Sequence, residues 1–461
     1  MSQQLLLAGT VITLNAERET IVAGAVLIDG DRIGAVGSAA ELRAAYPGAD
    51  VVDCGDGVIV PGFVNTHTHL FQTLLKGLGD DRVLKDWFTC MTGPSAAALT
   101  PEDCYAAALH GATEALTTGT TTLVDFMYVH PVPQLGDAVH AAMTDAGIRG
   151  VIARGYMTTG VDDGVPASLI EPLEVALGDT ERLIGQYNTA GGRVQIGLAP
   201  CMIWTVDEPT LRATRALADA TGALITMHVA ETGFEIENSL TRFGGRDTAV
   251  LERTGLLGPD LLAVHCVHCN DADIAALARH DVKVSHNPCS NLYLASGIAP
   301  VPKMQRRGLT VGLASDGPAS SNNHSMLQAM KFAALAQKGA SGDASIITAE
   351  RVLEMATIDG ARALGLDSEI GSIEAGKKAD LVLLRYDNLC VTPVNHPVSA
   401  LVYSARGDEV HSVWVDGRRV LNAGYLLSQD QQLVISAAQR AADSLVERAG
   451  TGWLRQRPWR A

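Results

Sequence analysis

Residues 58–69 of the chain read VIVPGFVNTHTH, an apolar run that ends in two histidines, His67 and His69. Such a run is typical of a buried strand, and alternate side chains of a strand project from the same face. Both imidazoles therefore point the same way at the strand end. Buried polar groups are costly unless something satisfies them, and a divalent metal is the usual partner of paired imidazoles. Alone, the pair is a weak signal, because solvated pairs of this kind are common.

Downstream of residue 61, apolar β-type runs alternate with helix-like segments rich in alanine and leucine. Near-continuous apolar runs favour parallel strands that are buried on both faces. Their alternation with helices predicts an α/β fold, a (β/α)8 TIM-like barrel over residues 61–365. We expect its strands at 63–67, 121–126, 150–154, 194–199, 223–228, 261–265, 282–286 and 309–315.

The two ends of the chain have a different pattern, short β-like runs separated by turns such as Asp29-Gly30-Asp31 and Asp416-Gly417-Arg418. We expect residues 1–60 and 366–425 to build one small β-sandwich domain together. Within the first sixty residues the spacing predicts an antiparallel sheet, with separate strands at 5–7 and 11–14. Residues 426–461 are predicted to be a C-terminal helical tail.

The composition is that of a soluble globular protein, 47% hydrophobic and 19% charged, with a formal net charge of −16. This balance argues against a nucleic-acid partner, because phosphate binding needs clustered lysine and arginine. The sequence lacks a signal peptide, an apolar run near the roughly 18 residues that span a bilayer, and a disulfide framework. We expect a cytoplasmic protein without a membrane partner, and a homodimer or higher homo-oligomer.

Three further residues of types that commonly bind metals lie at the ends of predicted strands. His228 ends the fifth strand, His265 ends the sixth, and Asp316 follows the eighth. Because the carboxyl ends of barrel strands share one rim, these residues are expected beside His67 and His69. Taken alone, a residue of this kind is an ordinary core or surface residue about as often as it is a metal ligand. Their joint placement is a strong signal.

The chemistry of this set assigns the roles of metal ligands. His67, His69 and His228 offer neutral nitrogen donors and Asp316 an anionic oxygen, which leaves one coordination position for water. A divalent metal lowers the pKa of such a water towards neutrality. We expect one ion per chain, Zn2+ with Fe2+ as the alternative, since this ligand set accepts either.

Three residues are predicted to be catalytic. Asp316 is placed to accept the proton of the water, and Glu231, three residues after His228, to shuttle a proton to the leaving group. His265 is expected to hydrogen-bond the attacking water, with direct ligation as the alternative.

Several motifs resemble the amidohydrolase superfamily. They are PGFVNTHTH at 61–69, HVAE at 228–231, HC at 265–266, SNL at 290–292 and SDG at 315–317. The resemblance covers nearly the whole chain, and it is closest to the mononuclear aminohydrolase branch. That branch contains guanine, 8-oxoguanine, cytosine and S-adenosylhomocysteine deaminases and the s-triazine hydrolases. Binuclear relatives usually carry a carbamylated lysine on the fourth strand, and residues 194–200 contain no lysine.

The resemblance also implies substrate-binding residues, namely Gln72, Trp87, Arg154, Cys201 and Asn291. Gln72 is similar to a base-reading glutamine of guanine deaminases. Adenosine-type deaminases usually carry a glutamate soon after the position of Trp87 and a histidine at that of Cys201, and this chain has neither. A free heterocycle is therefore favoured over a nucleoside.

The predicted function is a metal-dependent hydrolytic deaminase that releases ammonia from a nitrogen heterocycle such as an oxopurine, pterin, pyrimidine or aminotriazine. Glu231 favours an amine as leaving group, because an amine must be protonated to depart. Two alternatives use the same machinery, an s-triazine hydrolase that removes chloride or alkylamine and an adenosine-type deaminase of S-adenosylhomocysteine or methylthioadenosine. An inactive scaffold is disfavoured, because all five candidate ligand positions are filled.

Overall fold

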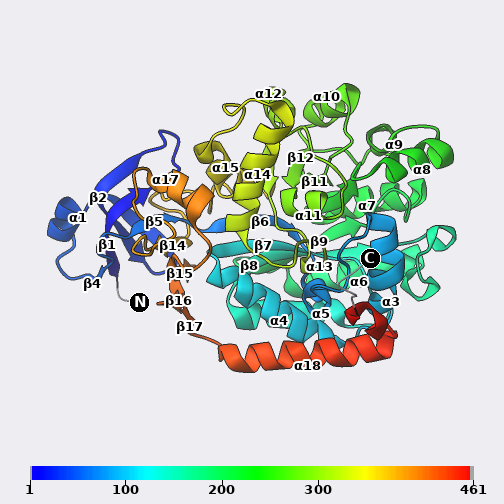
Figure 1. Cartoon of the computed structure of the whole chain (residues 1–461), viewed down its shortest axis with the longest axis horizontal. Coiled ribbons are helices and arrows are strands. Elements are labelled where there is room, and N and C mark those ends of the chain that lie inside the picture. The colour runs from blue at the N-terminus through cyan, green and yellow to red at the C-terminus, as the bar shows by residue number, and fades with distance from the viewer. Residues whose placement is uncertain (1–2, 457–461) are drawn as a thin grey trace.

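A computed structural model of the chain describes residues 3–456. Within them, a parallel eight-stranded sheet forms the centre of the molecule (Figure 1). Its strands follow one another in chain order: β6 (Phe63–Thr68), β7 (Thr120–Met127), β8 (Arg149–Tyr156), β9 (Val194–Pro200), β10 (Ile225–Val229), β11 (Leu261–His265), β12 (Lys283–His286) and β13 (Val311–Leu313).

The last strand of this sheet returns to the first. The Thr66 hydroxyl on β6 donates to the carbonyl oxygen of Leu313 on β13 at 3.1 Å, and the Asp316 N–H donates to the His67 carbonyl at 3.1 Å. The predicted TIM-like barrel is confirmed, and each predicted run coincides with an observed strand. The entry to β6 requires glycine, because a Cβ on Gly62 would lie 2.1 Å from the Thr121 hydroxyl oxygen.

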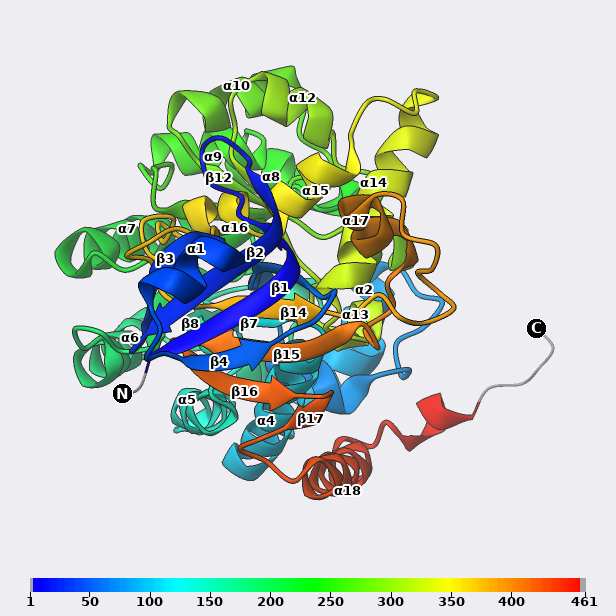
Figure 2. The ribbon, with the colours of Figure 1, turned by 90° about the vertical axis from the view of Figure 1, so that its left-hand side faces the viewer.

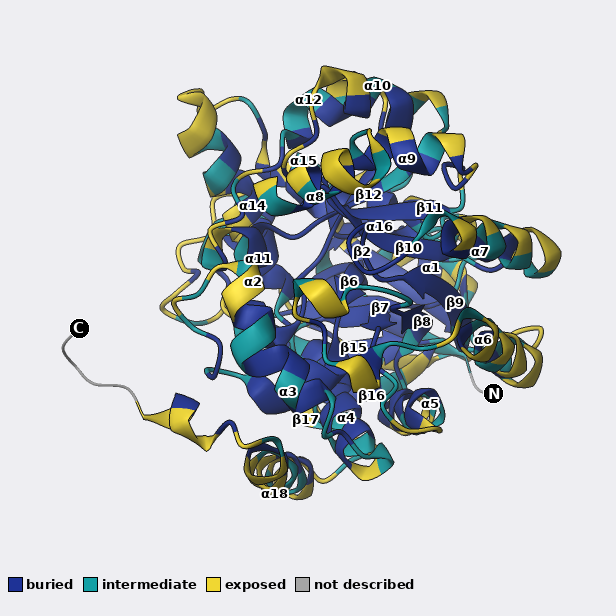
Figure 3. Cartoon of the chain, turned by 90° about the vertical axis from the view of Figure 1, so that its right-hand side faces the viewer, coloured by how far each residue is buried: buried dark blue, intermediate teal, exposed yellow. Residues whose placement is uncertain are grey.

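Helices surround the barrel with their outer sides exposed, whereas the strands are almost wholly buried (Figure 3). The longer ones are α4 (Pro101–Thr117), α5 (Leu135–Ala146), α6 (Leu173–Tyr187), α7 (Glu208–Thr221), α8 (Gly233–Phe243), α10 (Asp271–Arg279) and α14 (Met326–Ser341). Shorter ones are α9 (Asp247–Arg253), α11 (Pro288–Tyr293), α12 (Val301–Arg306), α15 (Ala349–Met355) and α16 (Ile358–Ala363).

A second, mixed sheet is built from both ends of the chain (Figure 2). Its strands are β1 (Gln4–Ile12), β2 (Thr20–Asp29), β3 (Arg32–Ser38), β4 (Asp50–Asp53), β5 (Val58–Pro61), β14 (Leu381–Leu384), β15 (Val410–Val415), β16 (Arg418–Asn422) and β17 (Tyr425–Leu426). The antiparallel pair of β5 and β14 joins the two ends.

One prediction for the first sixty residues is wrong, and another is confirmed in part. β1 is one continuous strand where two were expected. The predicted antiparallel pairing is found between β1 and β2 and between β2 and β3, whereas β1 pairs parallel with β4 and β5. The parallel pairing arises because the connection through β3 and α1 (Ala39–Ala45) returns the chain so that β4 runs in the same direction as β1.

The C-terminal helix α18 (Gln431–Ala449) lies along α4 (Figures 1 and 2). It corresponds to the predicted helical tail, whose last residues, 457–461, lie outside the described part of the chain. Among residues 3–456, no helix has the length and apolar character needed to cross a bilayer.

Candidate metal centre and active site

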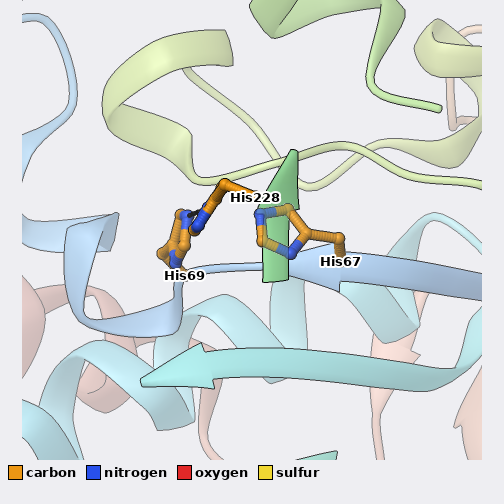
Figure 4. A group of neighbouring side chains, drawn as sticks. All are labelled: His67, His69 and His228. Atoms are coloured by element: carbon orange, nitrogen blue, oxygen red, sulfur yellow. Dashed lines mark hydrogen bonds between the residues drawn. The ribbon is translucent and has the colours of Figure 1, made fainter. Parts of the chain in front are cut away.

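The three histidines predicted as ligands converge from two strands of the barrel (Figure 4). His67 and His69 lie at the carboxyl end of β6, and His228 lies at that of β10. The Nε2 atoms of His69 and His228 are 3.4 Å apart. Asp316, just beyond β13, places Oδ1 3.5 Å from His67 Nε2 and 3.4 Å from His69 Nε2. All four side chains are buried.

Backbone carbonyls orient two of these imidazoles. His69 Nδ1 lies 2.7 Å from the Phe126 carbonyl oxygen, and His228 Nδ1 lies 2.8 Å from that of Cys201. Because Nδ1–H donates a hydrogen bond to the carbonyl oxygen in each case, Nε2 carries no proton and its lone pair is available to bind a metal.

His67 has no such hydrogen bond. Neither of its ring nitrogens makes a hydrogen bond within the described residues, although the side chain is completely buried. An unsatisfied buried imidazole is costly, and a divalent cation would satisfy it. The donor set of His67, His69, His228 and Asp316 therefore fits a zinc-like ion.

Burial also sets the protonation of the ligands. It lowers the pKa of His67 to about 4 and that of His69 to about 3, so both are neutral at physiological pH. Burial alone would raise the pKa of Asp316, but its close contact with His67 and the other neighbouring imidazoles hold this pKa well below the usual range. Neutral imidazoles and an ionised carboxylate are the forms that bind a metal.

Glu231 is buried beside this cluster. Its Oε1 accepts a hydrogen bond from the Ser296 hydroxyl at 3.1 Å, and its Oε2 lies 3.5 Å from His265 Nε2. Burial and the charge of Asp316 raise the pKa of Glu231 to about 8. A carboxyl group that holds its proton near neutral pH is suited to donate it to a leaving group.

The backbone carrying Glu231 is held by a second carboxylate. Glu235 on α8 accepts hydrogen bonds from the N–H groups of Glu231 and Thr232 at 2.7 and 2.9 Å. The preceding residue, Ala230, has a positive φ of 50°, as have His265 at 71° and Asp316 at 62°. Such left-handed residues other than glycine are strained and collect at functional sites.

His265, at the end of β11, is positioned by Asn291. Its Nδ1 lies 2.8 Å from Asn291 Oδ1, so Nδ1–H donates to the amide oxygen and Nε2 points towards the cluster. His265 Nε2 is 3.9 Å from Asp316 Oδ2. The residue thus stands between Glu231 and Asp316.

Several of these residues line one cavity. Its wall consists of His69, Gln72, Leu84, Trp87, Phe88, Tyr128, Met202, Trp204, His228, Glu231, His265, Leu294, Asp316 and Ser320. A larger groove, of about 1000 Å³, lies between α18 and the segment around Lys76, and none of the proposed metal ligands lines it.

The comparisons with known proteins agree with this geometry. The model of the amidohydrolase family matches residues 58–420. This chain belongs to the amidohydrolase family. A short segment of this amidohydrolase, residues 24–49, also matches an imidazolonepropionase-like composite domain of bacteria.

Two curated relatives of this amidohydrolase are deaminases. The chain is 40% identical to a 5'-deoxyadenosine deaminase of Methanothermobacter thermautotrophicus, over 92% of this chain and 95% of the relative. It is 37% identical to a 5-methylthioadenosine/S-adenosylhomocysteine deaminase of Desulforudis audaxviator, again over 92% and 95%. The predicted enzyme class, a hydrolase acting on carbon–nitrogen bonds of cyclic amidines, is confirmed.

A solved structure resembles this amidohydrolase over almost its full length. It is an adenosine deaminase from Xanthomonas campestris with bound zinc, 29% identical, with a TM-score of 0.89, covering 97% of this chain and 99% of the other. Zinc in that protein is consistent with the donor set found here.

The residues predicted to bind substrate divide into two groups. Gln72 and Trp87 line the cavity, whereas Arg154, Cys201 and Asn291 do not. The Arg154 guanidinium is held by Glu171 at 2.7 Å and Asp179 at 3.2 Å. The Cys201 carbonyl oxygen instead accepts a hydrogen bond from His228 Nδ1–H, and the Asn291 amide oxygen accepts one from His265 Nδ1–H.

Sequence reasoning missed several residues of the amidohydrolase cavity, which are Leu84, Phe88, Tyr128, Met202, Trp204, Leu294 and Ser320. Two of them had a positional signal. Met202 and Trp204 come directly after β9, and the loops that follow barrel strands form the active-site face.

Proposed function

We propose that this amidohydrolase is a metal-dependent deaminase of adenine nucleosides. The observation that carries the proposal is the placement of Glu231 in one cavity with His69, His228 and Asp316, in a chain whose curated relatives deaminate such nucleosides. These relatives favour the nucleoside alternative over the free heterocycle that the sequence suggested.

The metal would be held by His67, His69, His228 and Asp316, and we propose one zinc ion per chain. When bound, zinc polarises a water molecule and lowers its pKa towards neutrality. The remaining chemistry belongs to side chains of the cavity.

The reaction replaces an amino group by a carbonyl. Water adds to the ring carbon that bears the amine, and the electrons of the ring C=N double bond move to the ring nitrogen. When they return, the exocyclic carbon–nitrogen bond breaks and ammonia leaves, and the hydroxyl proton of the product moves to the ring nitrogen to give the carbonyl. The Asp316 carboxylate accepts the proton of the water, and Glu231 donates its proton so that the amine departs as a neutral molecule. His265, whose Nδ1–H donates to Asn291, offers Nε2 as the acceptor for a hydrogen of the attacking water and so orients that water.

The cavity is narrow in this conformation. It encloses about 30 Å³, whereas typical ligand pockets hold roughly 300–1,000 Å³. Binding a nucleoside therefore requires the cavity wall to open.

An ammonia-release assay of the zinc-loaded enzyme tests the proposal. We expect turnover of 5'-deoxyadenosine and 5'-methylthioadenosine, and little of adenine, guanine or a chlorotriazine. Turnover of free bases alone, or release of chloride alone, would contradict a nucleoside deaminase. Elemental analysis that finds two ions per chain would contradict the single metal.

We further propose the division of the chain expected from the sequence, with residues 1–60 and 366–425 as one domain, 61–365 as the barrel and 426–461 as a tail. A homodimer is likewise proposed, and light scattering of the purified protein tests it.

A further inference from the structure

The cavity has two chemically different sides. The proposed metal ligands and the acid–base groups Glu231 and His265 make up one side. The other side is apolar and is formed by Leu84, Trp87, Phe88, Met202, Trp204 and Leu294, which we call the apolar wall. Among the described residues that line the cavity there is no lysine or arginine, and the acids are Glu231 and Asp316 alone.

Trp204 is the fixed centre of the apolar wall. Its ring packs edge-on against Phe88, with centroids 5.8 Å apart and an interplanar angle of 89°, and against Phe234 at 5.8 Å. The Arg242 guanidinium donates to the Trp204 carbonyl at 2.8 Å. This arginine therefore holds the loop after β9 in place and does not line the cavity.

Two neutral polar atoms on the lining have no partner. Gln72 Oε1 and Trp204 Nε1 are buried and make no hydrogen bond within the described chain. The first is an acceptor and the second a donor. The cavity thus offers neutral hydrogen-bonding groups to a ligand, but no countercharge apart from its catalytic groups.

The nearby cations are engaged elsewhere. Arg154 is tied to Glu171 and Asp179. Lys85, next to Leu84, is exposed, and its ammonium lies over the Phe234 ring at 4.5 Å from the centroid. Neither residue lines the cavity.

We propose that this site selects adenine nucleosides whose 5' substituent is small and uncharged, such as hydrogen or methylthio, over nucleosides that end in a charged amino-acid group. The inference rests on the proposed function, because the reacting ring carbon must lie beside Glu231 and the metal ligands. The rest of the nucleoside then extends towards the apolar wall. An ammonium and a carboxylate buried there would lose their hydration without gaining partners, whereas a methyl or methylthio group gains apolar contact.

Steady-state kinetics of the zinc-loaded full chain tests this selection. We expect kcat/KM for 5'-deoxyadenosine and 5'-methylthioadenosine to exceed that for S-adenosylhomocysteine by about tenfold or more. Equal values for the three nucleosides would overturn the inference and leave the proposed function standing. Deamination of adenine alone would overturn both.

A charge placed on the apolar wall tests the position of the substituent. In Leu84→Arg, the ratio of kcat/KM for S-adenosylhomocysteine to that for 5'-deoxyadenosine should rise about tenfold, because the guanidinium pairs with the carboxylate. The matched control is Val83→Arg, which adds the same charge at an exposed neighbour outside the lining and should leave the ratio unchanged. Since both rates come from one preparation, any loss of folded enzyme cancels.

Two results with these variants would overturn the inference. One is an unchanged ratio in Leu84→Arg, which would place the substituent elsewhere. The other is a selective loss of S-adenosylhomocysteine turnover in Lys85→Ala, which would mean that a cation already serves this substrate.

Discussion

Glu231 and Asp316 are two buried carboxylic acids in one cavity whose surroundings drive their pKa values apart. The close contact with His67 and the neighbouring imidazoles hold the pKa of Asp316 well below its usual range, so that it stays ionised. Burial and the charge of Asp316 raise the pKa of Glu231 to about 8, and the hydrogen bond from the Ser296 hydroxyl offsets only part of this rise. Paired groups with opposite shifts are how one site supplies both a base and an acid near neutral pH.

Replacing the acid should stop the reaction without emptying the metal site. We expect Glu231→Gln to lower kcat by a factor on the order of 10²–10⁴, because the amide cannot donate a proton to the leaving amine. Zinc content per chain should stay unchanged. The control is Glu237→Gln, on the exposed side of α8, which should keep full activity. Undiminished turnover in Glu231→Gln would remove the residue from the mechanism.

Asp125 on β7 gives the fold a pH dependence. Its Oδ1 accepts from the Leu70 N–H at 2.7 Å and its Oδ2 has no partner, and burial raises its pKa from 3.8 to about 7. Between these values the unfolded chain loses the proton first, so the free energy of unfolding should fall as pH rises, by at most about 1.4 kcal/mol per pH unit.

Denaturant titrations at several pH values check this expectation. Asp125→Asn retains an acceptor for the Leu70 N–H and cannot ionise, so its stability should decline less between pH 4 and pH 7. An identical pH dependence in the two proteins would be the contrary result.

At the scale of elements, the junction between β5 and β6 is a point of close packing against Thr121 of β7. Gly62 lies at this joint, where its missing side chain lets the backbone pass the Thr121 side chain. The same step carries the chain from the mixed sheet into the barrel and so sets the position of His67 and His69.

A methyl group at this joint should be strongly destabilising. We expect Gly62→Ala to lower the free energy of unfolding by about 1–3 kcal/mol or more, because Thr121 and the strand behind it must shift. Gly178→Ala is the matched control. That glycine lies in α6 with open space around it, so the same change should stabilise the protein by about 0.4–1 kcal/mol. Equal effects of the two variants in urea unfolding would disprove the packing argument.

The elements that could be predicted are those with a periodic pattern. The barrel strands stand out as apolar runs, and the proposed metal ligands stand out because each ends or follows such a run. The role of Arg154 could not be predicted, because its partners Glu171 and Asp179 are 17 and 25 residues away and only the folded chain brings them together. Trp204 and the parallel pairing of β1 likewise depend on loop paths, which carry no periodic signal.

At the scale of the whole molecule, the barrel and the mixed sheet are joined by a buried ion-pair network. Arg149 at the start of β8 pairs with Asp380 at 3.1 Å and also with Asp416. The Asp380 side chain is only 2% exposed. Asp380 directly precedes β14 and Asp416 directly follows β15, so the network connects the start of β8 in the barrel to both of these strands of the mixed sheet.

Removing the cation should loosen this joint. We expect Arg149→Met to lower the free energy of unfolding by about 3–5 kcal/mol, because Asp380 is left as a buried charge without its partner. The control, Arg212→Met, removes an arginine that is 56% exposed and pairs with Glu208 on the surface, so it should cost no more than about 1 kcal/mol. Thermal unfolding of both variants gives the measurement, and similar losses would count against a stabilising role of the network.

The pairing of β5 with β14 has a consequence for the order of events during synthesis on the ribosome. Pro61 and Leu381 lie opposite each other in the sheet, yet they are 320 positions apart in the chain, and all eight barrel strands lie between them. While the barrel is being translated, β5 has an open edge that awaits its partner. Nascent chains that stop before residue 381 therefore carry an unpaired strand edge, and we expect them to be the aggregation-prone species of this protein.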